Sequence, residues 1–238
     1  MSKLFEKHRQ IFRDEFFWAD SDVSYAFASP EIWDSCRKRI RDSQNVLDLG
    51  CGPGTLLQNL RKESRGEIVG LDLSENRCSY AKITNPGCDL IIGNGLEEPF
   101  KDGIFDAVLS TQLIEHVDDK KLLREINRVL KDKGILVLGT VYRTNPKAHP
   151  IHPEHLREYS SLEELAKPLK ENGFEIKIAR ITAIEFSPID RVFRDLYRLH
   201  PSKFLAELPK HGGISGLRRL IKIKMRDAYY LEVVAEKN

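Results

Sequence analysis

Residues 45–55 have the sequence NVLDLGCGPGT, and this stretch decides the fold that we predict. The apolar run at residues 45–49 ends in glycines, which predicts a short buried strand. A helix is predicted directly afterwards, at residues 55–62. Glycines at alternate positions let the backbone turn sharply and let a ligand approach without meeting a Cβ atom. We therefore expect a ligand-binding loop between a strand and a helix.

The spacing of these glycines distinguishes two kinds of ligand. A dinucleotide loop of the GxGxxG type would have its third glycine at position 55, where this chain has Thr55. Asp48 precedes the first glycine by two residues, and a carboxylate there attracts a cation but adds little to a phosphate site. We expect a ligand with an amino group or a sulfonium. A nicotinamide oxidoreductase is the alternative, but no Tyr in the chain is followed four residues later by Lys.

Strand-like and helix-like segments alternate along most of the chain. Apolar runs predict strands at residues 45–49, 67–71, 89–92, 104–110, 135–141, 174–181 and 228–235. Helices are predicted at residues 55–62, 74–83, 120–130 and 161–172. Asp118 or Asp119 would cap the third of these helices, and Lys133-Gly134 would stop it. The alternation predicts an α/β fold with a mostly parallel sheet and helices on both faces.

Asp72 ends the second predicted strand, beside the glycine loop. A carboxylate at this place can accept hydrogen bonds from both hydroxyl groups of a ribose. The plainer alternative is that Asp72 only caps the next helix, for which Ser74 is already a good N-cap.

Four segments together resemble a class I S-adenosylmethionine-dependent methyltransferase: VLDLGCGPGTLL, GLDLS, IIGNGLEEPFKDGIFDAVLS and LLREINRVLKDKGILVLGT. The resemblance implies a Rossmann-like sheet of seven strands whose last strand is antiparallel, and residues 228–235 fit that strand. It implies S-adenosyl-L-methionine as cofactor, with the glycines under its methionine part and ribose, Asp72 on the ribose hydroxyls and Asn94 on the adenine amino group. The cofactor-binding residues expected from it are Asp48, Gly50, Gly52, Gly54, Asp72, Leu73, Asn94, Gly95 and Gln112.

Glu115 and His116 follow the fourth predicted strand and are the candidate catalytic residues. Either could act as a base or line the pocket, because carboxyl ends of parallel strands border the ligand crevice. The alternative is a structural turn. The segment also resembles quinone-biosynthesis O-methyltransferases, whose Glu-x-x-Glu-His stretch can use a divalent metal. Gln112 replaces the first Glu here, and a neutral amide is a poorer ligand for a hard cation, so we predict no metal.

A loop rich in Pro and His follows the fifth predicted strand, where the resemblance implies an acceptor pocket. We expect its side chains to line the substrate, with helix capping or a metal cluster as alternatives. The predicted substrate-binding residues are His149, His152, His155 and Tyr159.

Composition limits the class of protein. With 238 residues and 41% apolar residues, the chain can form a core, and we predict one domain over residues 1–238. This domain would include a helical extension at residues 1–43. It would also include a helical insertion at about 184–226, which would cover the substrate. The four cysteines form no CxxC pair and no signal peptide is evident, so we expect a cytoplasmic protein.

The late insertion is basic, with ten Lys and Arg against three Asp and Glu between residues 187 and 226. Basic and apolar residues together suit an anionic acceptor or an anionic membrane surface, although such charges are often simply solvated. Nucleic acid is a less favoured partner, because no module of stacking aromatics is evident. Nothing in the sequence predicts an oligomeric state.

These observations predict an S-adenosylmethionine-dependent methyltransferase that acts on a small or lipid-like acceptor, at oxygen. An RNA or protein methyltransferase and a non-catalytic cofactor-binding protein of the same fold are the alternatives.

Overall fold

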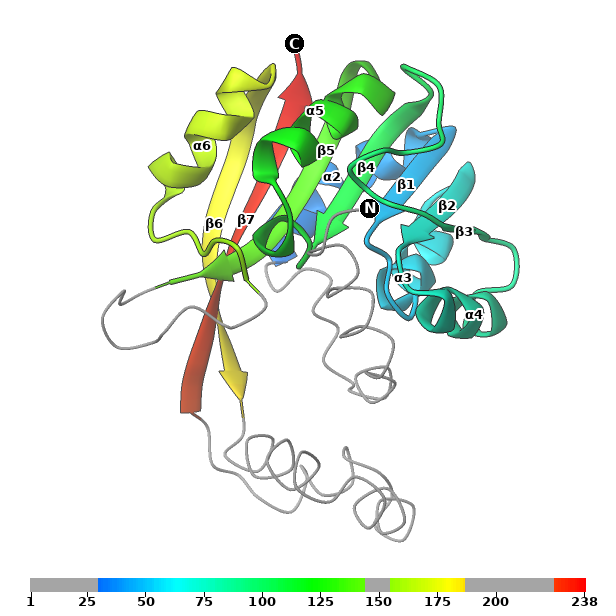
Figure 1. Cartoon of the computed structure of the whole chain (residues 1–238), viewed down its shortest axis with the longest axis horizontal. Helices are drawn as coiled ribbons and strands as arrows, with labels where there is room; N and C mark the ends of the chain where they lie inside the picture. Colours follow the sequence, from blue (N-terminus) through cyan, green and yellow to red (C-terminus); the bar gives the residue numbers. More distant parts are fainter. Residues whose placement is uncertain (1–29, 144–154, 187–224) are drawn as a thin grey trace, which may run out of the picture.

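The computed structural model describes residues 30–143, 155–186 and 225–238, and within them one seven-stranded sheet forms the centre of the molecule (Figure 1). The strand order is β3-β2-β1-β4-β5-β7-β6. The strands are β1 (Asn45–Leu49), β2 (Glu67–Asp72), β3 (Asp89–Ile92), β4 (Phe105–Thr111), β5 (Leu130–Tyr142), β6 (Phe174–Phe186) and β7 (Met225–Lys237).

Strands β1 to β5 pair in parallel, whereas β7 is antiparallel to both β5 and β6. The predicted fold class is confirmed, including the antiparallel last strand. The parallel strands β1, β2 and β4 end at the same edge of the sheet, where ligands bind in folds of this kind.

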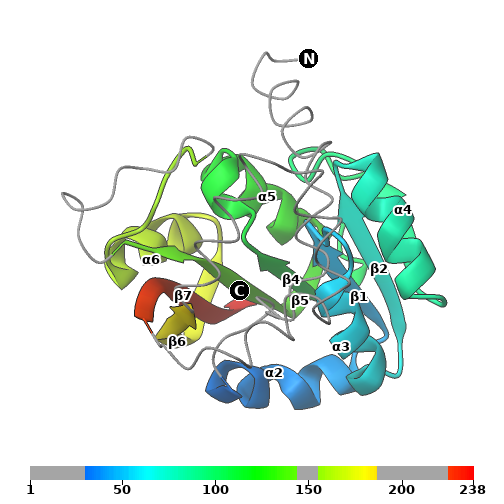
Figure 2. The ribbon, with the colours of Figure 1, turned by 90° about the horizontal axis from the view of Figure 1, so that it is seen from below.

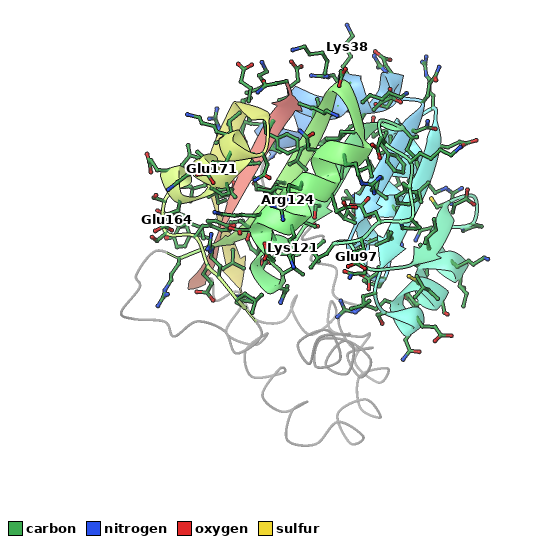
Figure 3. The ribbon with its side chains drawn as sticks, turned by 45° about the horizontal axis from the view of Figure 1, so that its top comes forward. Lys38, Glu97, Lys121, Arg124, Glu164 and Glu171 are labelled. Atoms are coloured by element: carbon green, nitrogen blue, oxygen red, sulfur yellow. The ribbon has the colours of Figure 1, made fainter. Side chains whose placement is uncertain are left out.

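Helices cover both faces of the sheet, as the alternating pattern predicted (Figure 2). One core cluster contains the apolar residues of α5 (Asp119–Val129) and α6 (Leu162–Glu171). The other contains those of α2 (Pro30–Asp42) and α3 (Thr55–Glu63), with Ala81 of α4 (Glu75–Thr84). The opposite faces of these helices are charged and exposed, as Figure 3 shows for Lys38, Lys121, Arg124, Glu164 and Glu171.

Side chains cap three of these helices. The hydroxyl of Ser74 accepts a hydrogen bond from the backbone N–H of Arg77 at the start of α4. At the start of α5 the cap is Asp118, which accepts from the N–H of Lys121, and this decides between the two predicted candidates. Ser161 caps α6 by accepting from the N–H of Glu164.

The end of α5 differs from the prediction. The helix stops at Val129, and Lys133-Gly134 lies inside β5 instead of between the two elements. Lys133 has a positive φ of 62°, and the register with β4 jumps from the pair Phe105–Leu130 to the pair Ala107–Ile135. The two residues therefore belong to an irregularity in the strand. The positive φ of Lys133 is a conformation that is also common where a helix ends.

The long last strands shorten the predicted insertion. Because β6 reaches Phe186 and β7 begins at Met225, both ends of the range 184–226 belong to the sheet. The rest of that insertion, residues 1–29 of the N-terminal extension, and both His149 and His152 lie outside the described residues.

No helix in the described ranges is long and apolar enough to cross a membrane. All four cysteines are buried free thiols: Cys36, Cys51, Cys78 and Cys88.

Candidate functional site

A pocket lies at the carboxyl ends of the parallel strands. Seven predicted site residues line it: Gly50, Asp72, Leu73, Asn94, Gly95, Gln112 and His116. Sequence reasoning missed Arg77 of α4 and the apolar residues Leu96, Leu113, Val117 and Leu122, which also line it. The pocket therefore combines apolar walls with a few polar groups, which is usual for a small-molecule site.

The glycines of the loop have separate roles. Gly50 has φ of 77° and lines the pocket, and a Cβ atom there would come within 3.2 Å of Leu113. Gly52 has φ of 52°, and its Cβ would point into open space. A Cβ on Gly54 would overlap the side chain of Asn85, so Gly54 permits packing against α4 instead of lining the pocket as predicted.

Asp72 joins the glycine loop to the start of α4. Its Oδ2 accepts a hydrogen bond from the N–H of Gly52 at 2.9 Å, and its Oδ1 accepts from the N–H of Ser74 at 2.8 Å. Each carboxylate oxygen can accept a further bond, so the pocket side of Asp72 is still able to bind a diol. The N-cap of α4 is Ser74. Asp72 also bonds to the glycine loop, so its contacts are not limited to the start of that helix, as the plainer alternative would have it.

Asp48 lies behind the loop and is not among the residues that line the pocket. It is buried, and its Oδ2 has no hydrogen-bond partner among the described residues. Burial and the charge of Asp72 raise the pKa of Asp48 to about 8. Asp48, which we predicted to bind the cofactor, is therefore separated from the pocket and does not line it.

Gln112 adopts an unusual backbone conformation at the end of β4. Its φ is 56°, in the region that residues with a Cβ rarely adopt, and its Nε2 is buried without a partner among the described residues. Strain and an unused donor in a pocket are typical of functional positions. Asn94 differs, because its Oδ1 already accepts a hydrogen bond from the N–H of Leu96 at 3.0 Å.

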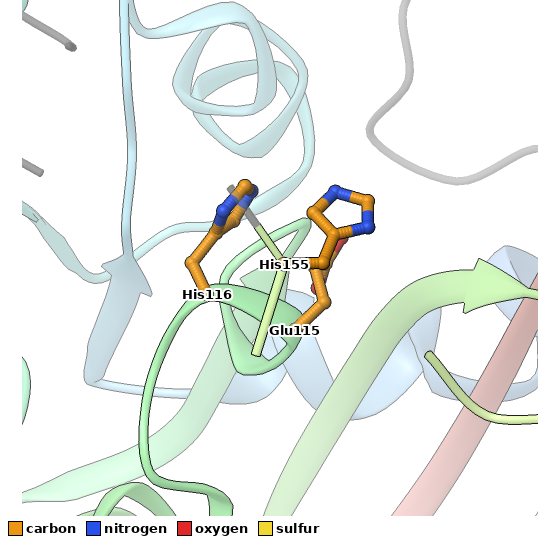
Figure 4. Close-up of side chains that lie close together, drawn as sticks. All are labelled: Glu115, His116 and His155. Carbon is orange, nitrogen blue, oxygen red and sulfur yellow. The ribbon is translucent and has the colours of Figure 1, made fainter. Parts of the chain in front are cut away.

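Glu115, His116 and His155 form a cluster beside the pocket (Figure 4). Glu115 is fully buried, and its Oε2 accepts a hydrogen bond from the Thr140 hydroxyl at 3.0 Å. Burial is the main cause that raises the pKa of Glu115 to about 7. His116 lines the pocket, whereas Glu115 lies behind it. The ring of His155 packs edge-on against His116, with centroids 4.9 Å apart.

The cluster brings His155, from beyond β5, to the two predicted catalytic residues. One ligand-type atom from each of the three lies within 4.8 Å of the others. One carboxyl oxygen of Glu115 and the Nδ1 of His155 already have protein partners. We assign no metal to this cluster, and the predicted absence of a metal stays a prediction.

Tyr159, a predicted substrate-binding residue, is instead part of the core. It is fully buried, and its hydroxyl donates a hydrogen bond to Asp119 at 3.2 Å. The apolar ring fills the core because β5 pairs with this segment through the Tyr142–Tyr159 bridge. Its neighbour Glu158, which sequence reasoning missed, bonds to His155. Only the spacing of the two residues, three apart, could have suggested this contact.

The site fits the cofactor that the resemblance implies. Gly50 leaves room beside the pocket wall, Asp72 offers a carboxylate for a ribose diol, and Gln112 has a buried amide donor without a partner among the described residues. These groups are suited to a nucleoside that carries an amino-acid chain.

Comparison with known proteins also indicates a methyltransferase domain. Residues 47–138 match the family described as "Methyltransferase domain". The chain is 27% identical to the 24-methylenesterol C-methyltransferase 2 of Arabidopsis thaliana, over 58% of this chain and 43% of that protein. It is 30% identical to a probable S-adenosylmethionine-dependent methyltransferase, Rv3030, of Mycobacterium tuberculosis, over 56% of this chain and 49% of that protein. The matches thus span about half the length of these two relatives.

A solved structure shares the fold over nearly the whole chain. It belongs to a putative sarcosine dimethylglycine methyltransferase from Galdieria sulphuraria, with a TM-score of 0.64, 16% identity and coverage of 98% of both chains. This likeness supports the architecture of the sheet and its helices.

Proposed function

Because the chain belongs to the class I S-adenosylmethionine-dependent methyltransferase family, we propose that it transfers a methyl group from S-adenosylmethionine to a small or lipid-like acceptor, at oxygen. The observation that carries the proposal is the meeting of two features in one pocket. Gly50 and Asp72 line it, and so does His116, which is clustered with Glu115 and His155.

The residues of the chain would divide the work as follows. Asp72, Leu73, Asn94, Gly95 and Gln112 line the pocket and would hold the cofactor. When bound, S-adenosylmethionine supplies an electrophilic methyl group and its own leaving group. The protein must then orient the acceptor and, for a hydroxyl group, remove its proton.

Oxygen is favoured by the groups beside the pocket. A sulfonium methyl needs no acid or base from the protein, whereas a hydroxyl acceptor has to lose a proton. Two imidazoles and a buried carboxyl group whose pKa is raised to about 7 lie within reach of one another. The sterol relative is named for transfer to carbon, so the choice of oxygen rests on this cluster and not on relatives. That relative does support an acceptor of lipid-like character.

The proposal extends to the kind of acceptor and to the location of the protein in the cell. The basic residues between 187 and 226 would favour an anionic acceptor or one at an anionic membrane surface. We keep the cytoplasm as the proposed location, because all four thiols are free.

The test is methyl transfer from radiolabelled S-adenosylmethionine to extracted lipids, soluble metabolites, RNA and protein as four separate fractions. Label in the lipid or soluble fraction, in a base-stable ether, supports the proposal. Label in RNA or protein would support the alternative acceptor classes. Binding of the cofactor with no label in any fraction would indicate a non-catalytic protein of this fold.

His116→Ala should lower turnover more than cofactor affinity, because its imidazole lies at the pocket without being needed for the ribose. An equal loss of both would leave His116 as a wall residue of the cofactor site.

A further inference from the structure

Two buried thiols lie beside the cofactor pocket, one on the glycine loop and one in the first turn of α4. They belong to Cys51 and Cys78, and they are hydrogen-bonded to each other. We propose that these two cysteines form a reversible disulfide under oxidation, and that this bond switches off cofactor binding. The inference goes beyond the proposed function, because it concerns regulation of the cofactor site and holds for any acceptor.

The ends of β2 and β3 hold both cysteines in place. The N–H of Cys51 donates a hydrogen bond to the carbonyl oxygen of Leu71 at 3.1 Å. Sγ of Cys78 lies 3.7 Å from the carbonyl oxygen of Asp72 and 3.7 Å from that of Ile91. Leu71 and Asp72 are consecutive residues, so the glycine loop and α4 are tied to the same point of the sheet.

The missing side chain of Gly70 leaves the space that the Cys51 thiol occupies. A Cβ atom on Gly70 would lie 3.0 Å from Sγ of Cys51, which is closer than side chains normally approach. The thiol therefore lies on this face of β2 and reaches toward α4, where it meets Cys78. A disulfide needs two sulfur atoms that can close to about 2.05 Å without a large movement of the backbone. Thiols already in contact meet this condition best.

The two thiols are not equivalent as nucleophiles. The thiolate is the reacting form of cysteine, and both a hydrogen-bond donor and a helix N-terminus favour it. The hydrogen bond from Cys51 is the main cause that lowers the pKa of Cys78. The same hydrogen bond, followed by burial, raises the pKa of Cys51. Cys78 is therefore the thiol that reacts first, and Cys51 is the one that completes the disulfide.

Oxidation by hydrogen peroxide balances with these two groups. The Cys78 thiolate attacks one peroxide oxygen, the O–O bond breaks, and the hydroxide that leaves takes up the former Cys78 proton as water. The Cys51 thiol then attacks the sulfur of the Cys78 sulfenic acid, and a second water leaves. The two thiols together lose two electrons and two protons, and the peroxide becomes two molecules of water. A thiol reductant reverses the reaction by exchange.

A disulfide would act on the pocket through the neighbours of Cys51. Gly50 lines the pocket, and the N–H of Gly52 donates to Oδ2 of Asp72 at 2.9 Å. Closing the sulfur atoms to bonding distance draws Cys51 toward α4, and the residues on both sides of it have to follow. The glycine loop then shifts against Asp72, the carboxylate that is suited to the ribose. The reduced protein binds the cofactor, and the oxidised protein loses this geometry.

The first measurement locates the disulfide in the full chain. The protein is treated with hydrogen peroxide, the remaining thiols are alkylated, and mass spectrometry of the non-reduced digest identifies any linked peptides. We expect Cys51 to be linked to Cys78, with Cys36 and Cys88 alkylated as free thiols. A disulfide between any other pair, or no disulfide at all, would overturn the proposal.

The second measurement is the affinity for S-adenosylhomocysteine, by titration calorimetry. Oxidation of the wild type should weaken binding about tenfold or more, as expected when a hydrogen bond to a charged group is lost. Dithiothreitol should restore the affinity. Cys78→Ser should bind like the reduced wild type before and after peroxide, whereas the matched control Cys88→Ser should stay sensitive.

Unchanged affinity of the wild type that carries the disulfide, or equal sensitivity of Cys78→Ser to peroxide, would refute the switch. The wild type alone supplies the mapped bond, the loss of affinity and its recovery, so the test stands even if Cys78→Ser does not fold. Neither measurement uses an acceptor. A failed methyl-transfer assay would therefore reject the proposed function, and the mapped disulfide with the affinity for S-adenosylhomocysteine would decide the switch separately.

Discussion

Asp48 is fully buried next to Asp72, and the charge of Asp72 adds to the effect of burial in raising the pKa of Asp48 to about 8. Asp48 is the last residue but one of β1 and Asp72 is the last residue of the adjacent β2, where it bonds to the glycine loop. One of them is therefore protonated near neutral pH, and a cationic ligand would favour the charged form of both.

This relationship predicts a pH-dependent stability. The folded-state pKa of Asp48 is above its ordinary value of 3.8, so the folded protein keeps a proton that the unfolded chain releases. The resulting stabilisation is full below about pH 4 and is lost as the pH rises to about 8. Asp48→Asn cannot titrate, so its free energy of unfolding should fall less between about pH 6 and pH 9, by about 1–3 kcal/mol. Urea unfolding at several pH values measures this.

The control for that measurement is Asp132→Asn. The side chain of Asp132 is 90% exposed, so its removal should leave the pH dependence as in the wild type. If Asp48→Asn followed the wild-type curve as well, the buried proton would not reside on Asp48.

Asp72→Ala should weaken the binding of S-adenosylhomocysteine by roughly 1.5–3 kcal/mol, as expected for a charge-assisted hydrogen bond. Its loss also frees the N–H groups of Gly52 and Ser74. Titration calorimetry gives the affinity, and Asp89→Ala at the start of β3 is the exposed control. Tight binding of NAD by the wild type, with no binding of S-adenosylhomocysteine, would reject the cofactor assignment for this pocket.

The buried carboxyl group of Glu98 predicts a second effect of pH on stability. Neither oxygen of its carboxyl group has a hydrogen-bond partner among the described residues, and its side chain is buried. Burial and the charge of Glu125 raise its pKa to about 8. The folded state therefore loses stability as the pH rises from the ordinary value of 4.5 to about 8.

Glu98→Gln should accordingly raise the midpoint of thermal unfolding above pH 8 and change it little near pH 5, because the amide imitates the neutral acid. A gain of about 1–3 kcal/mol at the alkaline end is the expected size for removing a buried charge. Glu97→Gln, at the exposed neighbouring position, is the matched control. A gain of equal size at both pH values would mean that packing, not charge, is improved.

Chelators should have little effect on methyl transfer. The cluster of Glu115, His116 and His155 has ligand-type atoms, but Gln112 supplies an amide where the quinone-biosynthesis pattern has a carboxylate. Dialysis against a chelator, followed by the transfer assay and by calorimetry with S-adenosylhomocysteine, measures the effect. Complete loss of transfer that Zn²⁺ or Mn²⁺ restores would establish a metal site here.

Local patterns predicted the parts of the site that depend on one strand and its following loop. Asp72 is the last residue of β2, and Gly50 and Gln112 directly follow β1 and β4, so parallel pairing brings the three to one pocket. The register of a strand is likewise set by its own alternating or apolar pattern. This is why the sheet, and the meeting of these three residues in one pocket, could be predicted from the sequence.

Contacts between distant segments were not predictable in this way. Tyr159 follows the loop that was predicted to line the acceptor pocket. Its backbone bridge to Tyr142 instead places its ring in the core. The buried Glu115 accepts its hydrogen bond from Thr140 of β5, 25 residues later in the chain. Lys133-Gly134 has the residues of a helix stop, but pairing between β4 and β5 turns it into a strand irregularity. Each outcome is decided by tertiary packing over local preference.

The last prediction concerns the basic segment between residues 187 and 226, whose charges would recognise an anionic acceptor or membrane surface. Replacing Arg218, Arg219, Lys222 and Lys224 with Gln should raise the acceptor KM and flatten its dependence on salt. Cofactor affinity should stay nearly unchanged, because the pocket is formed by residues 50–122. Flotation with and without anionic liposomes separates a membrane role from a soluble acceptor, since surface attraction is screened within about 10 Å at 0.1 M salt. If the quadruple variant matched the wild type in both assays, these charges would be solvated surface with no part in recognition.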